Sequence, residues 1–324
     1  MDKGWVLIYL FLLPSLLLAQ KTPRELPNWK TPTMGGKQFW SDELVFHDWR
    51  IQRNSWMNYC RLLDGENHRR AWGTFEQCRA KLEELRRRHK IAPMKGKVIV
   101  ALHGLIRTRA SMRNLSDYLK QSGDYTVITA SYASTRGTLD SHVDCLEKVI
   151  AHLGPDVTEI NFVAHSLGNL VIRRWLDRTY RGEGGLRPDP RVHRIVMMAP
   201  PNHGSQLSRI FKNNVVFKWV WGKSGVQLGT SWDLLEKGLA TPRCEFGILA
   251  GGGETPGQGR NRFLQGDNDF IVTVEETKLR GAADFAVLPV SHRLIMEDKT
   301  AQEYALRFFQ QGYFISPSRR QPLE

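Results

Sequence analysis

From about Lys95 onward, the chain alternates between short continuous apolar runs and longer amphipathic stretches. The apolar runs are KVIVALHG (97–104), YTVITASY (125–132), EINFVAHS (159–166), RIVMMAPP (194–201), EFGILAGG (245–252) and DFAVLPVSH (284–292). Runs of this length, bounded by glycine, proline or polar residues, are typical of strands buried on both faces. We therefore predict a strand at each of them.

Amphipathic patterns of helical period lie between these runs, at residues 140–153, 167–180 and 300–311. Alternating buried strands and helices predict an α/β fold, with a mostly parallel central sheet flanked by helices. The domain is predicted to span residues 95–324.

Residues 20–94 follow a different pattern. They contain five tryptophans, show no alternation typical of strands, and end in the amphipathic stretch FEQCRAKLEELRRRHK (75–90). We expect a helical, Trp-rich N-terminal extension that packs against the main domain. The cations of RRRHK stand where they complement the dipole of a helix C-terminus, so this run does not indicate a nucleic-acid site.

The first residues read MDKGWVLIYLFLLPSLLLAQ. Lys3 precedes an apolar run, Trp5–Leu18, which ends in the small residue Ala19. This order predicts a secretory signal peptide over residues 1–19, and an uncleaved N-terminal anchor is the alternative. In both cases we expect an exported protein, either periplasmic, extracellular or anchored to the envelope.

The chain is basic, with 46 Lys and Arg against 33 Asp and Glu, a formal net charge of +13. Such a surface favours anionic partners. Because no zinc-finger spacing or other nucleic-acid signature is present, we expect no nucleic acid as partner. Peripheral contact with an anionic membrane or envelope surface is the expected alternative.

There are four cysteines, Cys60, Cys78, Cys145 and Cys244. In an exported protein an even number permits disulfides, and Cys60–Cys78 is the pair we favour. Buried free thiols are the other interpretation. No CxxC spacing or other metal constellation occurs, so we expect neither a metal nor a cofactor.

Ser166 stands where the apolar run 160–164 ends and a helix is predicted to begin. The carboxyl ends of parallel strands form the functional edge of such a sheet. A sharp strand-to-helix turn would project the hydroxyl of Ser166 above that edge, provided that its neighbours are small. Ala164 and Gly168 meet this requirement. With the three residues between them, they form the motif A-H-S-L-G, residues 164–168.

This motif resembles the nucleophile elbow of the α/β-hydrolase superfamily, G-x-S-x-G, with Ala164 in place of the first glycine. The resemblance covers about Lys95 to the C-terminus, and it is strongest to the lipase- and esterase-like branch. It implies a base and an acid further along the chain. His292, at the end of the run 284–292, is the expected base. His165 adjoins the serine, but the turn would direct its ring elsewhere.

Asp269 is the expected acid. The stretch Asn268-Asp269-Phe270-Ile271-Val272 resembles an N-D-G-x-V segment of secreted bacterial lipases, with Phe270 in place of the glycine. Asp267 is the rival acid, because a loop without that glycine could turn earlier.

The resemblance also implies an oxyanion hole formed by two backbone N–H groups, those of Leu167 and Leu105. Leu105 follows His103-Gly104, and His103 is expected to hold this loop by side-chain hydrogen bonds. The segments SYASTRG (131–137) and APPNHGS (199–205) resemble loops of the same relatives. We expect Tyr132 and His203, which lie in them, at the pocket.

Residues at about 206–241 lie between two predicted strands, where α/β-hydrolases insert caps. This segment is strongly apolar, and the residues expected to line an acyl site are Phe217, Trp219 and Trp221. An ordinary helix packed on the sheet is the alternative interpretation.

Taken with the resemblance, these features predict a serine hydrolase that cleaves hydrophobic or lipid-like carboxylic esters through Ser166, His292 and Asp269. Thioester hydrolysis or acyl transfer would use the same machinery. A non-catalytic binding module of the same fold is the alternative of another class.

Overall fold

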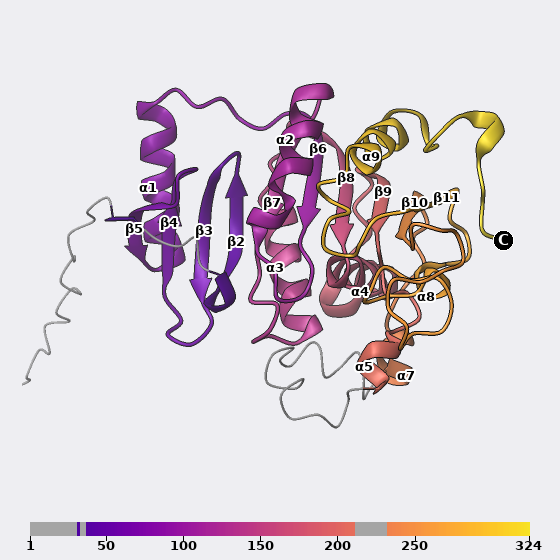
Figure 1. Cartoon of the computed structure of the whole chain (residues 1–324). Coiled ribbons are helices and arrows are strands. Elements are labelled where there is room, and N and C mark those ends of the chain that lie inside the picture. The colour runs from indigo at the N-terminus through magenta and orange to yellow at the C-terminus, as the bar shows by residue number, and fades with distance from the viewer. Residues whose placement is uncertain (1–30, 33–36, 211–231) are drawn as a thin grey trace, which may run out of the picture.

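The computed structural model describes residues 31–32, 37–210 and 232–324. The predicted signal peptide, 1–19, lies outside them, as do Phe217, Trp219 and Trp221 of the predicted cap. In the described part of the chain the strands form two sheets that lie side by side (Figure 1).

The larger sheet has six parallel strands in the order β11-β10-β9-β8-β6-β7. Their bounds are β6 Gly96–Leu102, β7 Thr126–Ala130, β8 Val157–His165, β9 Val192–Met198, β10 Glu245–Gly251 and β11 Asp284–Leu288. Each lies within or overlaps one of the six apolar runs. The predicted parallel sheet is therefore confirmed.

Both faces of this sheet are buried, which explains why its strands have no polar alternation. In β6, Val98, Val100 and Leu102 pack into one hydrophobic cluster. The intervening Ile99 and Ala101 pack into a second cluster on the opposite face. Burying one such Val, Leu or Ile side chain contributes about 1.5–3 kcal/mol relative to leaving it exposed.

Helices cover the two faces. Residues of α3 (Leu139–Ala151) and α4 (Leu167–Arg181) belong to the first cluster, and those of α2 (Arg113–Ser122) and α9 (Lys299–Gln311) to the second. The helices α3, α4 and α9 lie where amphipathic patterns predict them, whereas α2 was not predicted. The short helices are α5 Gln206–Ile210, α7 Trp232–Glu236, α8 Val274–Thr277, η1 Lys37–Phe39, η2 Arg109–Met112, η3 Glu183–Gly185 and η4 Pro317–Arg319.

The described part of the N-terminal extension is built on a sheet, so the prediction of a helical extension was wrong. Its strands form an antiparallel sheet in the order β1-β5-β4-β3-β2, which is followed by one helix, α1 (Figure 1). The bounds are β1 Thr31–Pro32, β2 Trp40–Phe46, β3 Trp49–Asn54, β4 Cys60–Leu63, β5 His68–Gly73 and α1 Phe75–Arg88. Only α1 was predicted correctly. A capping box between Thr74 and Gln77 begins it.

The strands escaped prediction because one row of their buried side chains is polar. Asp42, Gln52 and Arg61 lie opposite one another on β2, β3 and β4. Gln52 donates to Asp42 at 2.7 Å, and Arg61 donates to Gln52 at 2.9 Å. All three are buried. Cross-strand hydrogen bonds satisfy these groups, so burial does not require the apolar residues that the sequence pattern would reveal.

The two sheets meet between β2 and the end of β7. Asp42 donates its backbone N–H to the Ser131 carbonyl at 2.8 Å, and its carboxylate accepts the Ser131 N–H at 2.7 Å. Burial raises the pKa of Asp42 above its ordinary value, although the charge of Arg50 opposes this shift. The N-terminal sheet thus continues the edge of the main sheet through hydrogen bonds as well as packing.

None of the four cysteines, all within the described residues, forms a disulfide. Cys60 and Cys78 are both buried, and burial raises the pKa of each thiol to about 12. The pair that we favoured is therefore two buried thiols. Among the residues that the structure describes, no helix combines the length and the hydropathy needed to span a membrane.

Candidate active site

A one-residue turn joins β8 to α4. His165 is the last residue of β8 and Leu167 is the first of α4, so Ser166 alone makes the turn. It adopts φ 52° and ψ −120°, a conformation that is strained for a residue with a Cβ. Its N–H donates to the Met198 carbonyl on β9 at 2.9 Å, which holds the turn against the sheet. The Asn169 side chain also donates to the Ser166 carbonyl, at 3.0 Å.

Two glycines allow the chain to pack closely around this turn. A Cβ on Gly168 would lie 2.9 Å from both the Cβ and the carbonyl oxygen of Leu102, at the end of β6. A Cβ on Gly104 would lie 3.0 Å from the Cβ of Ser166 and 2.7 Å from Nδ1 of His165. The loop after β6 therefore lies directly against the turn after β8.

A buried carboxylate and histidine form the second part of the site. His292 Nδ1 lies 2.7 Å from Asp269 Oδ2. The other oxygen, Oδ1, accepts the N–H groups of Ile271 and Val272 at 3.0 and 2.8 Å. The His292 N–H donates to the Asp269 carbonyl at 2.9 Å. Asp269 is fully buried, and these donors replace the water that its carboxylate loses.

The rival acid, Asp267, has other partners. Its carboxylate oxygens accept the N–H groups of Gly253 at 2.7 Å and Gly257 at 3.1 Å. It therefore shapes the loop after β10, and it is Asp269 that faces His292. Phe270 has φ 88°, so it keeps the left-handed backbone that favours glycine at this position.

The ring of His165 bonds to the loop that carries His292 and not to its neighbour Ser166. Its Nε2 lies 2.8 Å from the backbone carbonyl of His292, and the two rings lie 4.7 Å apart. Burial, followed by the charge of His292, lowers the pKa of His165 well below its ordinary value. The ring thus links the turn at Ser166 to the loop that carries His292.

His103 and Tyr132 support the loop after β6. His103 Nδ1 lies 2.9 Å from the Gly104 carbonyl, and its Nε2 accepts the Tyr132 N–H at 3.3 Å. The Tyr132 hydroxyl donates to the His103 carbonyl, and the two rings stack. Burial lowers the pKa of His103 to about 4. Tyr132 is almost fully buried, so it lies beneath this loop and not at an open pocket wall as expected.

The two residues expected to supply oxyanion N–H groups flank the turn. Leu167 is the first residue of α4, where backbone N–H groups lack a partner within the helix. Leu105 directly follows Gly104, whose Cα packs against Ser166. His203 is half-exposed and lies 3.5 Å from a carboxylate oxygen of Glu236, beside α7.

Gln38 is a residue near this site that the sequence did not indicate. Its Nε2 donates to the Arg107 carbonyl at 3.0 Å, in the loop after β6. Its Oε1 accepts the N–H of Thr135 at 2.9 Å, in the loop after β7. The N-terminal extension thus holds together two loops of the main domain. A lone polar amide in η1 gives no local signal of this role.

A group of possible metal ligands lies elsewhere in the described residues, in the turn between β4 and β5. Ligand atoms of Asp64, Glu66 and His68 lie within 4.8 Å of one another. However, Asp64 Oδ1 accepts the backbone N–H groups of Glu66 and His68, and Arg70 lies 3.3 Å from Oδ2. These bonds define the turn, and we assign no metal to it.

Comparison with solved structures identifies the fold. A lipase from Bacillus licheniformis, BlEst2 in its mature form, superposes with a TM-score of 0.52 and 17% identity over 69% of this chain and 95% of that chain. The chain has the α/β-hydrolase fold. Phospholipase PlaB from Legionella pneumophila gives a TM-score of 0.50 and 18% identity over 67% of this chain. The match covers 60% of the PlaB chain.

The comparisons by sequence found no relative. No protein-family model matches the chain, and no curated protein sequence matches it significantly. The α/β-hydrolase fold is therefore established by structure and not by sequence similarity. It places Ser166 at the carboxyl edge of the sheet, where this fold carries its nucleophile elbow.

The close contact at Gly168 can be tested without any assumption about activity. Gly168→Ala would force a Cβ against the backbone of Leu102, so we expect it to destabilise the protein by about 1–3 kcal/mol. Gly238→Ala is the matched control, because its nearest neighbour would lie at an ordinary 3.5 Å. Urea unfolding followed by circular dichroism measures both. Equal stability of the two variants would contradict the proposed contact.

Proposed function

We propose that the protein is a serine hydrolase that cleaves carboxylic esters, with Ser166 as nucleophile, His292 as base and Asp269 as acid. The observation that carries this proposal is the buried Asp269–His292 pair, which is joined through His165 to the strained turn at Ser166. An acid, an imidazole and a serine at one edge of the sheet form the arrangement that activates a hydroxyl.

In the proposed first step, the Ser166 oxygen attacks the ester carbonyl carbon while His292 Nε2 accepts the hydroxyl proton. Asp269 stays ionised and stabilises the imidazolium through Nδ1. The negative charge that develops on the carbonyl oxygen would be held by the N–H groups of Leu105 and Leu167. Collapse of this intermediate breaks the ester C–O bond, and His292 gives its proton to the leaving alcohol.

The second step removes the acyl group from Ser166. A water molecule attacks the acyl carbon while His292 again accepts a proton. The carboxylic acid leaves, and the proton returns to the Ser166 oxygen. This cycle requires no metal and no cofactor.

We favour hydrophobic, lipid-like esters as substrates. The structural neighbours named above are a lipase and a phospholipase. The loops that surround the site also expose large apolar side chains, which we call the apolar rim. Its four members are each 44–67% exposed and are Ile106, Phe263, Phe270 and Leu294.

Several arginines lie next to the apolar rim. Arg107, Arg262 and Arg293 each adjoin one of its members in the sequence. The guanidinium of Arg262 lies over the Phe263 ring at 5.4 Å, and that of Arg260 lies 5.9 Å from the Phe270 ring. Apolar side chains bordered by cations match a surface of anionic lipid, with acyl chains below the headgroups. We therefore propose that the protein, exported through its predicted signal peptide, contacts an anionic membrane or envelope surface through this rim.

The nucleophile is tested by a fluorophosphonate probe, which labels activated serines covalently. Ser166→Ala should abolish labelling, because it removes the only side-chain hydroxyl at the turn between β8 and α4. Circular dichroism establishes that the variant is folded. Labelling of the folded variant at the wild-type level would refute the assignment.

The choice of acid is tested by two matched substitutions. Asp269→Asn should lower kcat by up to about 10⁴-fold, because the charge that stabilises the imidazolium is lost. Asp267→Asn should lower kcat far less, because Asp267 bonds only to loop N–H groups. Steady-state kinetics on a short p-nitrophenyl ester measure both. A severe loss for Asp267 beside a mild loss for Asp269 would reverse the assignment.

The apolar rim is tested by sedimentation with vesicles. The double variant Phe263→Ser/Leu294→Ser should bind phosphatidylglycerol vesicles at least tenfold more weakly than wild type. Val287→Ser is the control, since Val287 is an exposed apolar residue on β11, outside the rim. Unchanged binding by the double variant, with probe labelling retained, would contradict this surface.

A further inference from the structure

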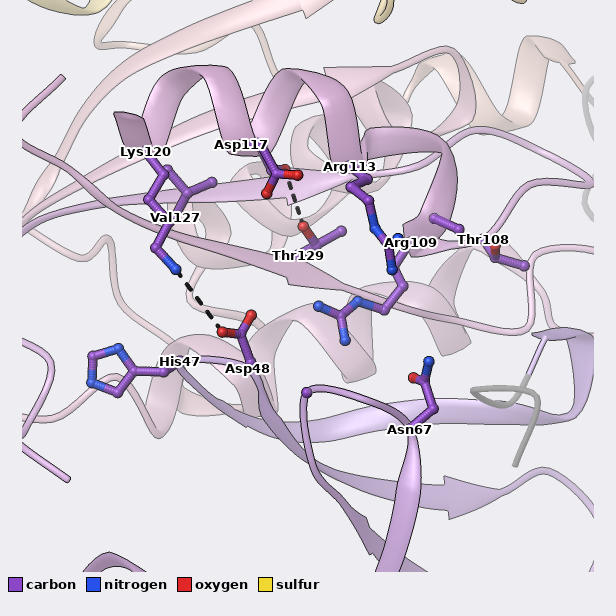
Figure 2. Close-up of a pocket in the computed structure, with 13 residues that line it drawn as sticks. His47, Asp48, Asn67, Thr108, Arg109, Arg113, Asp117, Lys120, Val127 and Thr129 are labelled. Carbon is purple, nitrogen blue, oxygen red and sulfur yellow. Dashed lines mark hydrogen bonds and ion pairs between the residues drawn. The ribbon is translucent and has the colours of Figure 1, made fainter. Parts of the chain in front are cut away.

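A cavity lies between α2 and the N-terminal sheet. Its volume is about 160 Å³, and the turns between β2 and β3 and between β4 and β5 close it on one side. Side chains that line it include Asp48, Asn67, Arg109, Arg113 and Lys120 (Figure 2). None of the proposed catalytic residues is among its lining residues. The cavity is therefore a separate site.

Two arginines extend into this cavity. Figure 2 shows Arg109, from η2, and Arg113, the first residue of α2, reaching into the space above Asn67. Within the described residues neither guanidinium forms an ion pair or a hydrogen bond through its side chain. Arginine is a strong donor of paired hydrogen bonds, and two such groups beside one small cavity favour an anion between them.

A third guanidinium, that of Arg50, lies against the same region and is fully buried. Its Nη2 donates to Oδ1 of Asn67, which lines the cavity. Its Nε and Nη1 have no hydrogen-bond partner. Burial and then the charge of Arg109 lower the pKa of Arg50 to about 10, so the two cations are close enough to repel each other. An anion beside them would relieve this repulsion.

The nearby carboxylates are not the anion that would relieve the repulsion between these arginines. Asp42 acts on both Arg50 and Arg109 electrostatically, but its oxygens accept hydrogen bonds from Gln52 and Ser131, and no ion pair joins it to either arginine. Asp48 pairs with Lys120 at 3.9 Å, as Figure 2 shows. Asp117 is exposed on α2 at the cavity rim, with no ion pair to Arg113.

Size and chemistry together select the ligand. A cavity of about 160 Å³ is below the range of about 300–1,000 Å³ that is usual for drug-sized ligands, so its volume favours a small ligand. A phosphate group is small, carries up to two charges, and presents several oxygens for two arginines. Thr108 lies beside Arg109 in the lining and adds a hydroxyl donor.

We propose that this cavity binds a phosphate group, held by Arg109 and Arg113, with the charge of the buried Arg50 nearby. The phosphate belongs either to a soluble phosphate or phosphomonoester or to the headgroup of a lipid. This site is independent of the ester hydrolysis proposed above, because its residues are not those of the proposed triad.

The test uses the full-length protein and inorganic phosphate as probe, by isothermal titration calorimetry at constant ionic strength. Wild type should bind one phosphate saturably. The double variant Arg109→Gln/Arg113→Gln should bind it at least tenfold more weakly. Arg87→Gln/Arg88→Gln removes the same charge from exposed positions on α1 and should change the affinity less than twofold.

A second measurement guards against a folding defect in the double variant. Phosphate should raise the Tm of wild type and of the α1 control, because a ligand that binds the folded state stabilises it. It should not raise the Tm of the cavity variant, whose Tm without phosphate shows whether it is folded. Absence of saturable binding by wild type would overturn the proposal, as would full affinity in the folded cavity variant.

The source of the phosphate is decided by two further ligands. Glycerol phosphate in solution should compete with inorganic phosphate if the site takes soluble phosphomonoesters. Phosphatidate in phosphatidylcholine vesicles should recruit wild type more than the cavity variant if the site takes a lipid headgroup. Because neither arm measures ester hydrolysis, failure here is distinguishable from failure of the proposed hydrolase function.

Discussion

The close approach of α4 to the end of β6 is the constraint on which the rest of the site depends. Gly168 leaves no room for a Cβ between the helix and Leu102, and this contact forces the chain to turn within the single residue Ser166. Once the turn is fixed, Gly104 can lie against it. This contact sets the position of the loop after β6, which contains Gly104. A longer turn would move the serine away from the loop after β6.

Of the eight non-glycine residues with positive φ in the described part of the chain, two lie where the proposed chemistry needs them. Ser166 and Phe270 both have positive φ although both carry a Cβ. Each such residue costs about 1–3 kcal/mol, and it persists only when its surroundings hold it. Ser166 is held by its bond to Met198, and Phe270 by its bond to Asn268. The strain at Phe270 maintains the loop in which the Asp269 carboxylate accepts its hydrogen bonds.

The N-terminal sheet is an integral part of this architecture. It reaches the main domain through Asp42, which binds Ser131, and through Gln38, which joins the loops after β6 and β7. The same junction creates the cavity beside α2, since Asp48 and Asn67 come from turns of the N-terminal sheet and Arg109 from the main domain. A domain without this sheet would lack both the bridge and one wall of the cavity.

The sequence alone determined the features that depend on local pattern. Continuous apolar runs indicated the six parallel strands, because a strand covered on both faces must be apolar throughout, and the A-H-S-L-G motif indicated the turn at Ser166. The lipase-like N-D-x-x-V pattern also favoured Asp269 over Asp267, and the structure places Asp269, not Asp267, beside His292.

Tertiary structure decided what depends on partners distant in the chain. The strands of the N-terminal sheet carry buried polar side chains, and only cross-strand partners such as Gln52 make their burial possible. Arg109, which lines the cavity beside α2, and the buried Arg50, which feels its charge, come from segments about sixty residues apart. A local pattern records which side chains must avoid water, but a polar group gains its partner only when the chain has folded.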